Sequence, residues 1–405
     1  MQAVELKKGV HWVGAIDWNG KDFHGYSQAQ YGTTYNAFVI KDEKTTLIDT
    51  VKADYKGEFF CNLSQVVGDL ENIDYIVANH LEPDHAGCLV EAVERIKPEK
   101  IFVSPMGKRS LETIYHAKDW PLEICKSGTS ASIGSRTMQF VETRMLHWPD
   151  NMVTYIPEDK LLICSDAFGQ NWATSERFAD EVEPVLLERL LKEYFANIVQ
   201  PYSPVVLKTL DAIEELKLDV DMLMPDHGLI WRGEGVKFVL DKYREYSMGA
   251  PKPKALIFYD TMWHSTENMA SAIASGIKSE GIEVRIMHVK KHHHSAIMTE
   301  LMDCGAVLAG SPTHNNGILP YMASTLTYMK GLRPQNKVGG AFGSFGWSGE
   351  CVKILSDWLG QFCDVVMENP VKIKNVPEHT DYEECYTYGQ SVAKALKEKI
   401  AAYKG

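Results

Sequence analysis

Residues 75–87 read YIVANHLEPDHAG, and this stretch decides how the first half of the chain is interpreted. The apolar run Tyr75–Ala78 is typical of a buried strand, and a helix is predicted over Gly87–Ile96. Four metal-binding side chains lie within six residues at the turn between them: His80, Glu82, Asp84 and His85. Because α/β sheets place their chemistry beyond the carboxyl ends of the strands, this turn predicts a metal site.

Three later turns repeat this context. His147 follows the predicted strand Thr137–Glu142, Asp166 follows Leu161–Cys164, and His227 follows Met222–Met224. A single histidine after a strand is more often a hydrogen-bonded structural residue than a ligand. Seven candidate ligands at four turns of one sheet nevertheless favour a metal centre.

These turns resemble those of the metallo-β-lactamase superfamily. Its hydrolases carry H-x-H-x-D-H at the first turn, whereas this chain carries H-x-E-x-D-H, with Glu82 in place of the second histidine. That replacement is the mark of the flavodiiron proteins. The resemblance covers the whole chain, is closest to the oxygen-reducing members, and includes the phrases His24-Gly25, Gly32–Asn36, His147–Asp150 and Asp166–Gln170.

The resemblance implies a pair of iron ions bridged by a carboxylate and by solvent. The implied ligands are His80, Glu82 and His147 for one ion, Asp84, His85 and His227 for the other, and Asp166 between them. Exchanging an imidazole for a carboxylate adds a hard, negatively charged oxygen donor, which favours iron over zinc. A water ligand in place of His85 stays open as an alternative, because a neighbour of Asp84 must turn sharply to reach the same ion.

A domain boundary is predicted near Met248–Lys254, where a glycine and two prolines interrupt the pattern, giving domains 1–250 and 251–405. The first domain opens with strand signals in Val10–Ile16, Thr34–Ile40 and Thr45–Asp49, and helices and strands then mix. The resemblance implies a metallo-β-lactamase-like αββα sandwich for this domain.

The second half alternates strand and helix five times, from the predicted strand Ala255–Tyr259 to the predicted helix Tyr382–Ala402. This alternation predicts a flavodoxin-like, doubly wound parallel sheet, so both domains belong to the α/β class.

Three loops of the second half carry a predicted FMN site. The first loop places hydroxyl groups at the start of a helix, where backbone N–H groups can bind a phosphate. It lacks the lysine that is characteristic of loops that bind nucleoside triphosphates. The other two follow the third and fourth predicted strands, the fourth being Val338–Phe342, and resemble the loops that hold the flavin ring in flavodoxins. The predicted FMN-binding residues are Thr261, Met262, Trp263, His264, Ser265, Thr266, Ser311, Pro312, Thr313, His314, Asn315, Asn316, Ser344, Phe345, Gly346, Trp347, Ser348 and Gly349.

Two features of these loops leave alternatives open. His264 departs from the flavodoxin pattern, in which glycine is common at that position. Ser265 or Thr266 also suits a simple helix cap, and Gly343–Gly349 an ordinary turn.

The resemblance implies reduction of dioxygen to water, with two electrons from the flavin and two from the irons. His24 and Tyr26 are predicted to line the substrate pocket, with His24 donating to bound oxygen; a surface role is the alternative. Reduction of nitric oxide to N2O on the same site stays open. A di-zinc hydrolase joined to a flavodoxin-like module and a non-catalytic electron carrier or redox sensor are remote alternatives.

Composition bounds the partners and the location. A net charge of −12 argues against nucleic acid and anionic membranes as main partners. No apolar run long enough to span a membrane and no apolar signal region at the N-terminus occur, so a cytoplasmic protein is expected.

The electron donor is expected to be a separate protein. The eight cysteines form no C-x-x-C pair, so a four-cysteine iron site in this chain is not expected. Rubredoxin or a similar carrier is the predicted donor. The resemblance further implies a head-to-tail homodimer, or a dimer of dimers, in which the flavin of one subunit meets the irons of the other.

Overall fold

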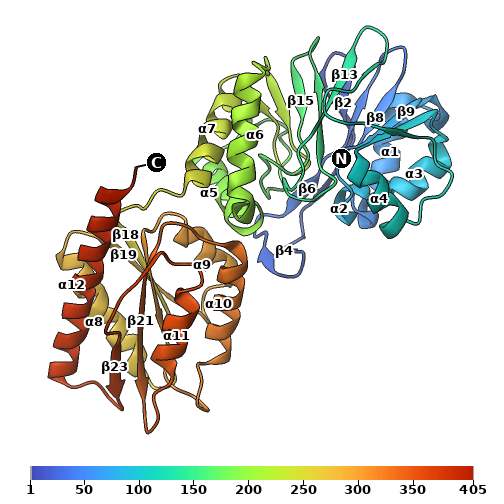
Figure 1. Ribbon diagram of the computed structural model, residues 1–405. Coiled ribbons are helices and arrows are strands. Elements are labelled where there is room, and N and C mark those ends of the chain that lie inside the picture. The colour runs from blue at the N-terminus through green and yellow to red at the C-terminus, as the bar shows by residue number, and fades with distance from the viewer. Residues whose placement is uncertain (1, 405) are drawn as a thin grey trace. The chain divides into compact units, whose positions relative to one another are not determined.

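The computed structural model describes residues 2–404, which divide into two compact units (Figure 1). The first unit comprises the chain up to Gly25, Ala29–Tyr194 and Pro204–Arg244. The second comprises Tyr26–Gln28, Phe195–Ser203 and the chain from Glu245 onward. The domain limits 1–250 and 251–405 stay a prediction.

The first unit contains two mixed sheets. One has the order β1 (Val4–Lys7), β2 (Val10–Trp12), β7 (Phe38–Ile40), β8 (Thr46–Ile48), β9 (Tyr75–Ala78), β10 (Lys100–Val103) and β11 (Leu122–Ile124). The other has the order β12 (Ser130–Ser132), β13 (Thr137–Glu142), β14 (Met152–Ile156), β15 (Leu161–Ile163), β16 (Met222–Met224) and β17 (Trp231–Arg232).

Helices cover the outer face of each sheet, giving four layers (Figure 1). The first sheet carries α1 (Lys56–Val67), α3 (Leu89–Ile96) and α4 (Pro105–Ile114), and the second carries α5 (Pro184–Tyr194), α6 (Ser203–Glu215) and α7 (Glu234–Met248). Between the sheets lies an apolar layer in which Phe102 stacks on Phe140 with ring centroids 5.3 Å apart. The αββα sandwich of the metallo-β-lactamase fold is confirmed.

The strand signals over Val10–Ile16 correspond to two short strands and not to one continuous strand. The chain leaves the first sheet after β2, and β3 (Ala15–Asp17) pairs instead with β6 (Thr33–Tyr35) in a separate ribbon. Gly14 lies at this break, packed against the Tyr35 carbonyl oxygen so closely that a side chain would collide with it. This close contact joins residues that are distant in sequence, so the local pattern did not reveal it. The predicted strand region Thr34–Ile40 is likewise divided between β6 and β7.

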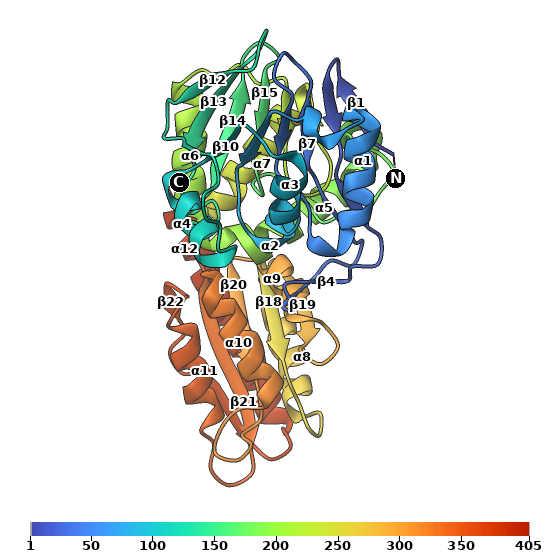
Figure 2. The same cartoon turned by 90° about the vertical axis from the view of Figure 1, so that its right-hand side faces the viewer.

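The second unit is a parallel sheet of order β19 (Glu283–His288), β18 (Lys254–Tyr259), β20 (Ala306–Gly310), β21 (Val338–Phe345) and β22 (Val365–Val366), with β23 (Val371–Lys374) also paired to β21. Helices α8 (Ser265–Ser279) and α12 (His379–Ala402) pack on one face. Helices α9 (His294–Leu301), α10 (Pro320–Leu332) and α11 (Cys351–Leu359) pack on the other, with α10 and α11 visible in Figure 2. The doubly wound, flavodoxin-like sheet is confirmed.

The loop predicted to begin after Phe342 is wrong in its first part. Strand β21 continues to Phe345 because β23 pairs with Phe342–Phe345 in parallel register. The sequence Gly343-Ser344 looks like a turn locally, and only a partner strand distant in sequence makes it extended.

The longest helix of the described chain, α12, has 24 residues and carries charged side chains along its length. No helix within residues 2–404 is both long and apolar enough to cross a membrane.

Helices α8 and α12 approach each other through two glycines. A Cβ at Gly276 would collide with the Tyr386 carbonyl oxygen, and a Cβ at Gly389 with the Ile273 carbonyl oxygen. Both obstacles are backbone atoms, so they cannot move aside without separating the helices. Because neither position carries a side chain, α8 and α12 can pack closely against each other on this face of the sheet.

We therefore expect Gly276→Ala to lower the free energy of unfolding of the second unit by about 1–3 kcal/mol through overpacking. Gly331→Ala, at a helical glycine with open space around it, is the matched control and should be neutral or stabilising. Urea unfolding followed by flavin fluorescence measures both variants. Equal stabilities would contradict the proposed close contact.

Candidate metal centre and ligand pocket

The first turn after β9 is organised by a one-turn helix, α2 (Pro83–Ala86). Glu82 precedes the helix in extended conformation and Pro83 starts it, so Asp84 and His85 lie within the turn itself. This local helix supplies the sharp change of direction that His85 needs to reach the same place as Asp84.

Four side chains from three turns form a first cluster: His80, Glu82, His147 and Asp166. One ligand atom from each lies within 4.8 Å of all the others. The His147 Nε2 atom is 2.8 Å from Asp166 Oδ2 and 3.4 Å from Glu82 Oε2. The His80 Nε2 atom is 3.2 Å from the same Asp166 Oδ2. Three of these side chains are buried, as expected for a centre shielded from solvent.

Asp84, His85 and His227 form a second cluster. The His227 Nε2 atom is 3.2 Å from Asp84 Oδ2, and the His85 Nε2 atom is 3.4 Å from Asp84 Oδ1. The other oxygen of Asp166, Oδ1, is 3.0 Å from His85 Nε2 and 3.3 Å from His227 Nε2. The two oxygens of one carboxylate therefore face the two clusters, which is the arrangement of a bridging ligand.

Hydrogen bonds on the far side of two imidazoles fix which nitrogen faces the clusters. The Nδ1–H group of His227 donates to the Thr34 carbonyl oxygen at 2.7 Å, and the Nδ1–H group of His80 donates to Asp150 Oδ2 at 3.2 Å. Each Nε2 lone pair then points at carboxylates, as in metal-binding histidines held by a second acceptor.

The donor set fits a pair of metal ions. Buried atoms without a hydrogen-bond partner include Asp84 Oδ1, Asp166 Oδ2, His85 Nε2 and His227 Nε2, all facing the clusters. Buried polar atoms are normally paired, and lone pairs directed at carboxylate oxygens repel them unless a cation lies between. Nitrogen and carboxylate oxygen donors without sulfur suit iron, zinc or manganese.

Electrostatics lead to the same requirement. Burial lowers the pKa of His85, but the carboxylates of Asp84 and Asp166 outweigh it and raise the pKa to about 10. For His147, burial is likewise outweighed by Asp166 and Glu82, and its pKa rises to about 9. The carboxylates are stabilised only when positive charge, from protons or from metal ions, lies among them.

His24 and Tyr26 differ in their surroundings. The His24 Nε2 atom is 3.5 Å from Glu82 Oε1, at the edge of the first cluster. Burial lowers the pKa of His24 despite the nearby Glu82, which favours the neutral ring. Tyr26 is 69% exposed, and its carbonyl oxygen accepts a hydrogen bond from His294. A pocket role for Tyr26 stays a prediction.

Two residues near the clusters were not predicted from the sequence. Tyr194 on α5 donates from its hydroxyl to Asp166 Oδ1 at 3.1 Å, and Asp150 accepts from His80 and from the Leu81 backbone N–H. Tyr194 lies among the apolar residues of its helix, so no local pattern distinguishes it. Asp150 could have been suspected, because it follows His147-Trp148-Pro149 in a turn that already carries a candidate ligand.

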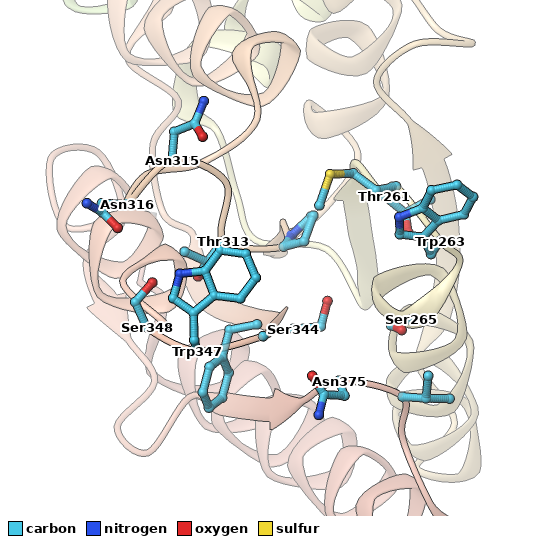
Figure 3. A pocket seen from close by; sticks show the side chains of 15 residues that line it. Thr261, Trp263, Ser265, Thr313, Asn315, Asn316, Ser344, Trp347, Ser348 and Asn375 are labelled. Atoms are coloured by element: carbon cyan, nitrogen blue, oxygen red, sulfur yellow. The ribbon is translucent and has the colours of Figure 1, made fainter.

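The second unit contains a cavity of about 810 Å³, within the size range of cofactor sites. Thirteen of the residues predicted for FMN line it: Thr261, Met262, Trp263, Ser265, Pro312, Thr313, Asn315, Asn316, Ser344, Phe345, Gly346, Trp347 and Ser348. Trp263 and Trp347 lie on opposite sides of the cavity (Figure 3), and their side chains are 86% and 91% exposed. The cavity thus offers two aromatic walls and a floor of hydroxyl and amide groups.

The other five predicted residues do not line this cavity: His264, Thr266, Ser311, His314 and Gly349. Thr266 joins two of the loops, because its hydroxyl lies 3.0 Å from the Ser344 hydroxyl. Two lining residues, Asn375 and Val376, were not predicted. They follow β23, the strand that the local sequence did not reveal.

His264 occupies a backbone conformation that favours glycine, with φ at 69° before α8. Its ring compensates through a contact of 2.6 Å from Nδ1 to Glu267 Oε2. The histidine therefore forms a left-handed turn directly before α8, whose first residue, Ser265, lines the cavity.

Comparisons with known proteins match each half of the chain to a known family. Residues 33–228 match the model of the ODP family beta lactamases, and residues 257–389 match flavodoxins. The chain is 53% identical to the rubredoxin oxygen:oxidoreductase of Desulfovibrio gigas, whose structure superposes with a TM-score of 0.97 over 99% of this chain and 100% of that one. The flavodiiron protein of Giardia intestinalis is 32% identical, with a TM-score of 0.94 over 99% of this chain and 98% of that one. A nitric oxide reductase of Moorella thermoacetica is 41% identical over 97% of this chain and 98% of its own.

Removing the metal should make stability depend on pH. Folding raises the pKa of His85 to about 10 and that of His147 to about 9, above the value of 6.5 for an unperturbed histidine. Both therefore stabilise the metal-free protein fully below pH 6.5, and this stabilisation is lost as the pH rises through 9 to 10.

Calorimetry of the chelated protein should show its Tm falling by several degrees between pH 6.5 and 10. The iron-loaded protein is the control and should change less, because metal ions replace the protons. Parallel pH profiles for the two forms would contradict this assignment.

Asp150 should control metal affinity through His80. We expect Asp150→Ala to weaken iron binding by roughly 10–100-fold, because the His80 ring loses the acceptor that orients it. Asp150→Asn keeps an oxygen acceptor at that position and should retain most of the affinity. Competition with a chelator followed by iron analysis measures both, and equal affinities of Asp150→Ala and the unmodified protein would contradict the role.

Proposed function

The chain belongs to the flavodiiron family, and on this premise we propose that it reduces dioxygen to water with four electrons. It is an oxidoreductase whose cofactors are FMN and a pair of iron ions. The observation that carries the proposal is the Asp166 carboxylate, whose oxygens face two histidine clusters, one of them containing Glu82. The FMN cavity of the second unit supports it.

We assign the metal centre to a domain of residues 1–250 and FMN to a domain of residues 251–405. The proposed iron ligands are His80, Glu82 and His147 for one ion and Asp84, His85 and His227 for the other, with Asp166 shared. His85 is included as a direct ligand because its Nε2 atom is buried, unpartnered and 3.0 Å from Asp166.

When bound, the irons supply a site for dioxygen and two electrons, and FMN supplies two more. The protein's own residues set the conditions for that chemistry. The His24 ring lies 3.5 Å from Glu82 and is about one-third exposed, so it can donate a hydrogen bond at the entrance and exchange protons with solvent. The Tyr194 hydroxyl donates to Asp166 and holds the shared carboxylate in place.

Rubredoxin, or a similar small electron carrier, is the proposed donor. The name of a relative that is 53% identical, the rubredoxin oxygen:oxidoreductase of Desulfovibrio gigas, supports this choice of donor. We further propose a head-to-tail homodimer or a dimer of dimers, in a cytoplasmic location. A fully active monomer in sedimentation would exclude the dimer requirement.

Nitric oxide reduction, from two NO to N2O and water, is the second candidate function. The observation that favours it is the 41% identity to a nitric oxide reductase over nearly the full chain. Both candidate reactions would use the same ligand set in this chain, and a comparison of the two gases distinguishes them.

The test is gas consumption by protein loaded with iron and FMN, with reduced rubredoxin as donor and dioxygen or nitric oxide as substrate. We expect dioxygen to be consumed faster, with four electrons per molecule and no accumulated peroxide. We also expect His24→Asn to slow this reaction by roughly 10-fold or more, since proton donation typically contributes 10²–10⁴-fold. Faster loss of nitric oxide with N2O formed would favour the second function, and no turnover of either gas would contradict both.

A further inference from the structure

A second cavity, of about 40 Å³, lies in the first unit between the outer face of the second sheet and α6. Strand alternation turns Val141, Val153 and Leu162 to this face, while their neighbours in sequence pack between the two sheets. From the helix, Ala212 and Ile213 close the other side. The lining is almost wholly apolar.

The residues that line the cavity range from exposed positions on and beside α6 to buried positions in the turns that carry the metal ligands. Ala212 on α6 is exposed, and Leu216, which follows the helix, is 60% exposed. Leu146, Ala167 and Phe168, which line the cavity from the turns, are all buried.

Two of the buried lining residues are the chain neighbours of candidate ligands on separate turns. Leu146 directly precedes His147, and Ala167 directly follows Asp166. The His147 Nε2 and Asp166 Oδ2 atoms are themselves 2.8 Å apart. On both turns, a residue of the apolar lining is therefore one position along the chain from a candidate ligand.

Water is a poor occupant of this space. A buried water needs two to four polar partners, and apolar cavities without them stay dry. The Thr209 hydroxyl is already bonded to the Val205 carbonyl oxygen and the Cys164 thiol to the Ala167 carbonyl oxygen. Among the lining side chains, only the Thr143 hydroxyl has no hydrogen-bond partner. A water molecule in the cavity would therefore find one free polar side chain, whereas it needs at least two partners.

We propose that this cavity is a binding site for small apolar gases and that it delivers the gaseous substrate to the metal centre. Uncharged diatomic molecules such as dioxygen and nitric oxide dissolve better in apolar surroundings than in water, so they concentrate where water does not. The volume of about 40 Å³ exceeds the roughly 10–15 Å³ that a single water molecule requires, so a molecule somewhat larger than water fits. The delivery role rests on the proposed function, whereas gas binding does not.

The first experiment locates the gas site without using turnover. Crystals of the protein loaded with iron and FMN are pressurised with xenon, which enters dry apolar cavities, and its anomalous signal is mapped. We expect a xenon atom between Leu162 and Ile213. Absence of xenon from the cavity would overturn the proposal.

The second experiment fills the cavity. Ile213→Trp, from the helix, and Val153→Phe, from the sheet, should each abolish the xenon site and raise the KM for dioxygen at least about threefold, with kcat nearly unchanged. Glu215→Trp adds the same ring to an exposed position of the same helix and is the matched control. The iron and FMN contents of each variant identify any variant that fails to fold. The two filling variants test the cavity independently, because their side chains enter it from opposite walls.

The outcomes separate this proposal from the proposed function. Loss of xenon with an unchanged KM for both gases in both variants would overturn delivery. An unmodified protein that consumes neither gas would contradict the proposed function, and the xenon map would still decide whether the cavity binds gas.

Discussion

The structure of the first unit depends on one buried carboxylate. Asp166 is fully enclosed, and burial alone would raise its pKa, yet the histidines around it hold that pKa well below its usual range. A buried carboxylate is stable in its charged form only if positively charged groups lie close to it on both sides. The four turns of the sandwich are arranged so that imidazoles from two clusters provide those contacts, and outer acceptors such as Asp150 and the Thr34 carbonyl oxygen orient them.

The two units divide the chemistry by the kind of surface each offers. The metal clusters are built from buried side chains at strand ends, where packing fixes distances. The cavity that we assign to FMN is built from loops beyond a parallel sheet, with exposed Trp263 and Trp347 as its walls. The first arrangement suits ions that must be held rigidly, and the second suits a flat, large cofactor that exchanges electrons with another protein.

The sequence was sufficient wherever the signal was local. Strand ends followed by His, Asp or Glu predicted all seven residues of the clusters, and regular alternation predicted the doubly wound sheet. It was insufficient where a partner distant in sequence decides the outcome: Gly14 breaks a strand because Tyr35 packs against it, and β21 extends because β23 pairs with it. Tyr194 was missed for the same reason, since only tertiary packing brings its hydroxyl to Asp166.

We propose that Glu82, standing where the hydrolases have histidine, makes this centre select iron. The most direct measurement is the metal content of the purified protein and of Glu82→His, each refolded with equal iron and zinc, together with Mössbauer spectra of the iron-57 form. We expect two irons per chain with the spectrum of a coupled pair, and a shift toward zinc in Glu82→His. Zinc in the unmodified protein, or two irons retained unchanged in Glu82→His, would contradict it.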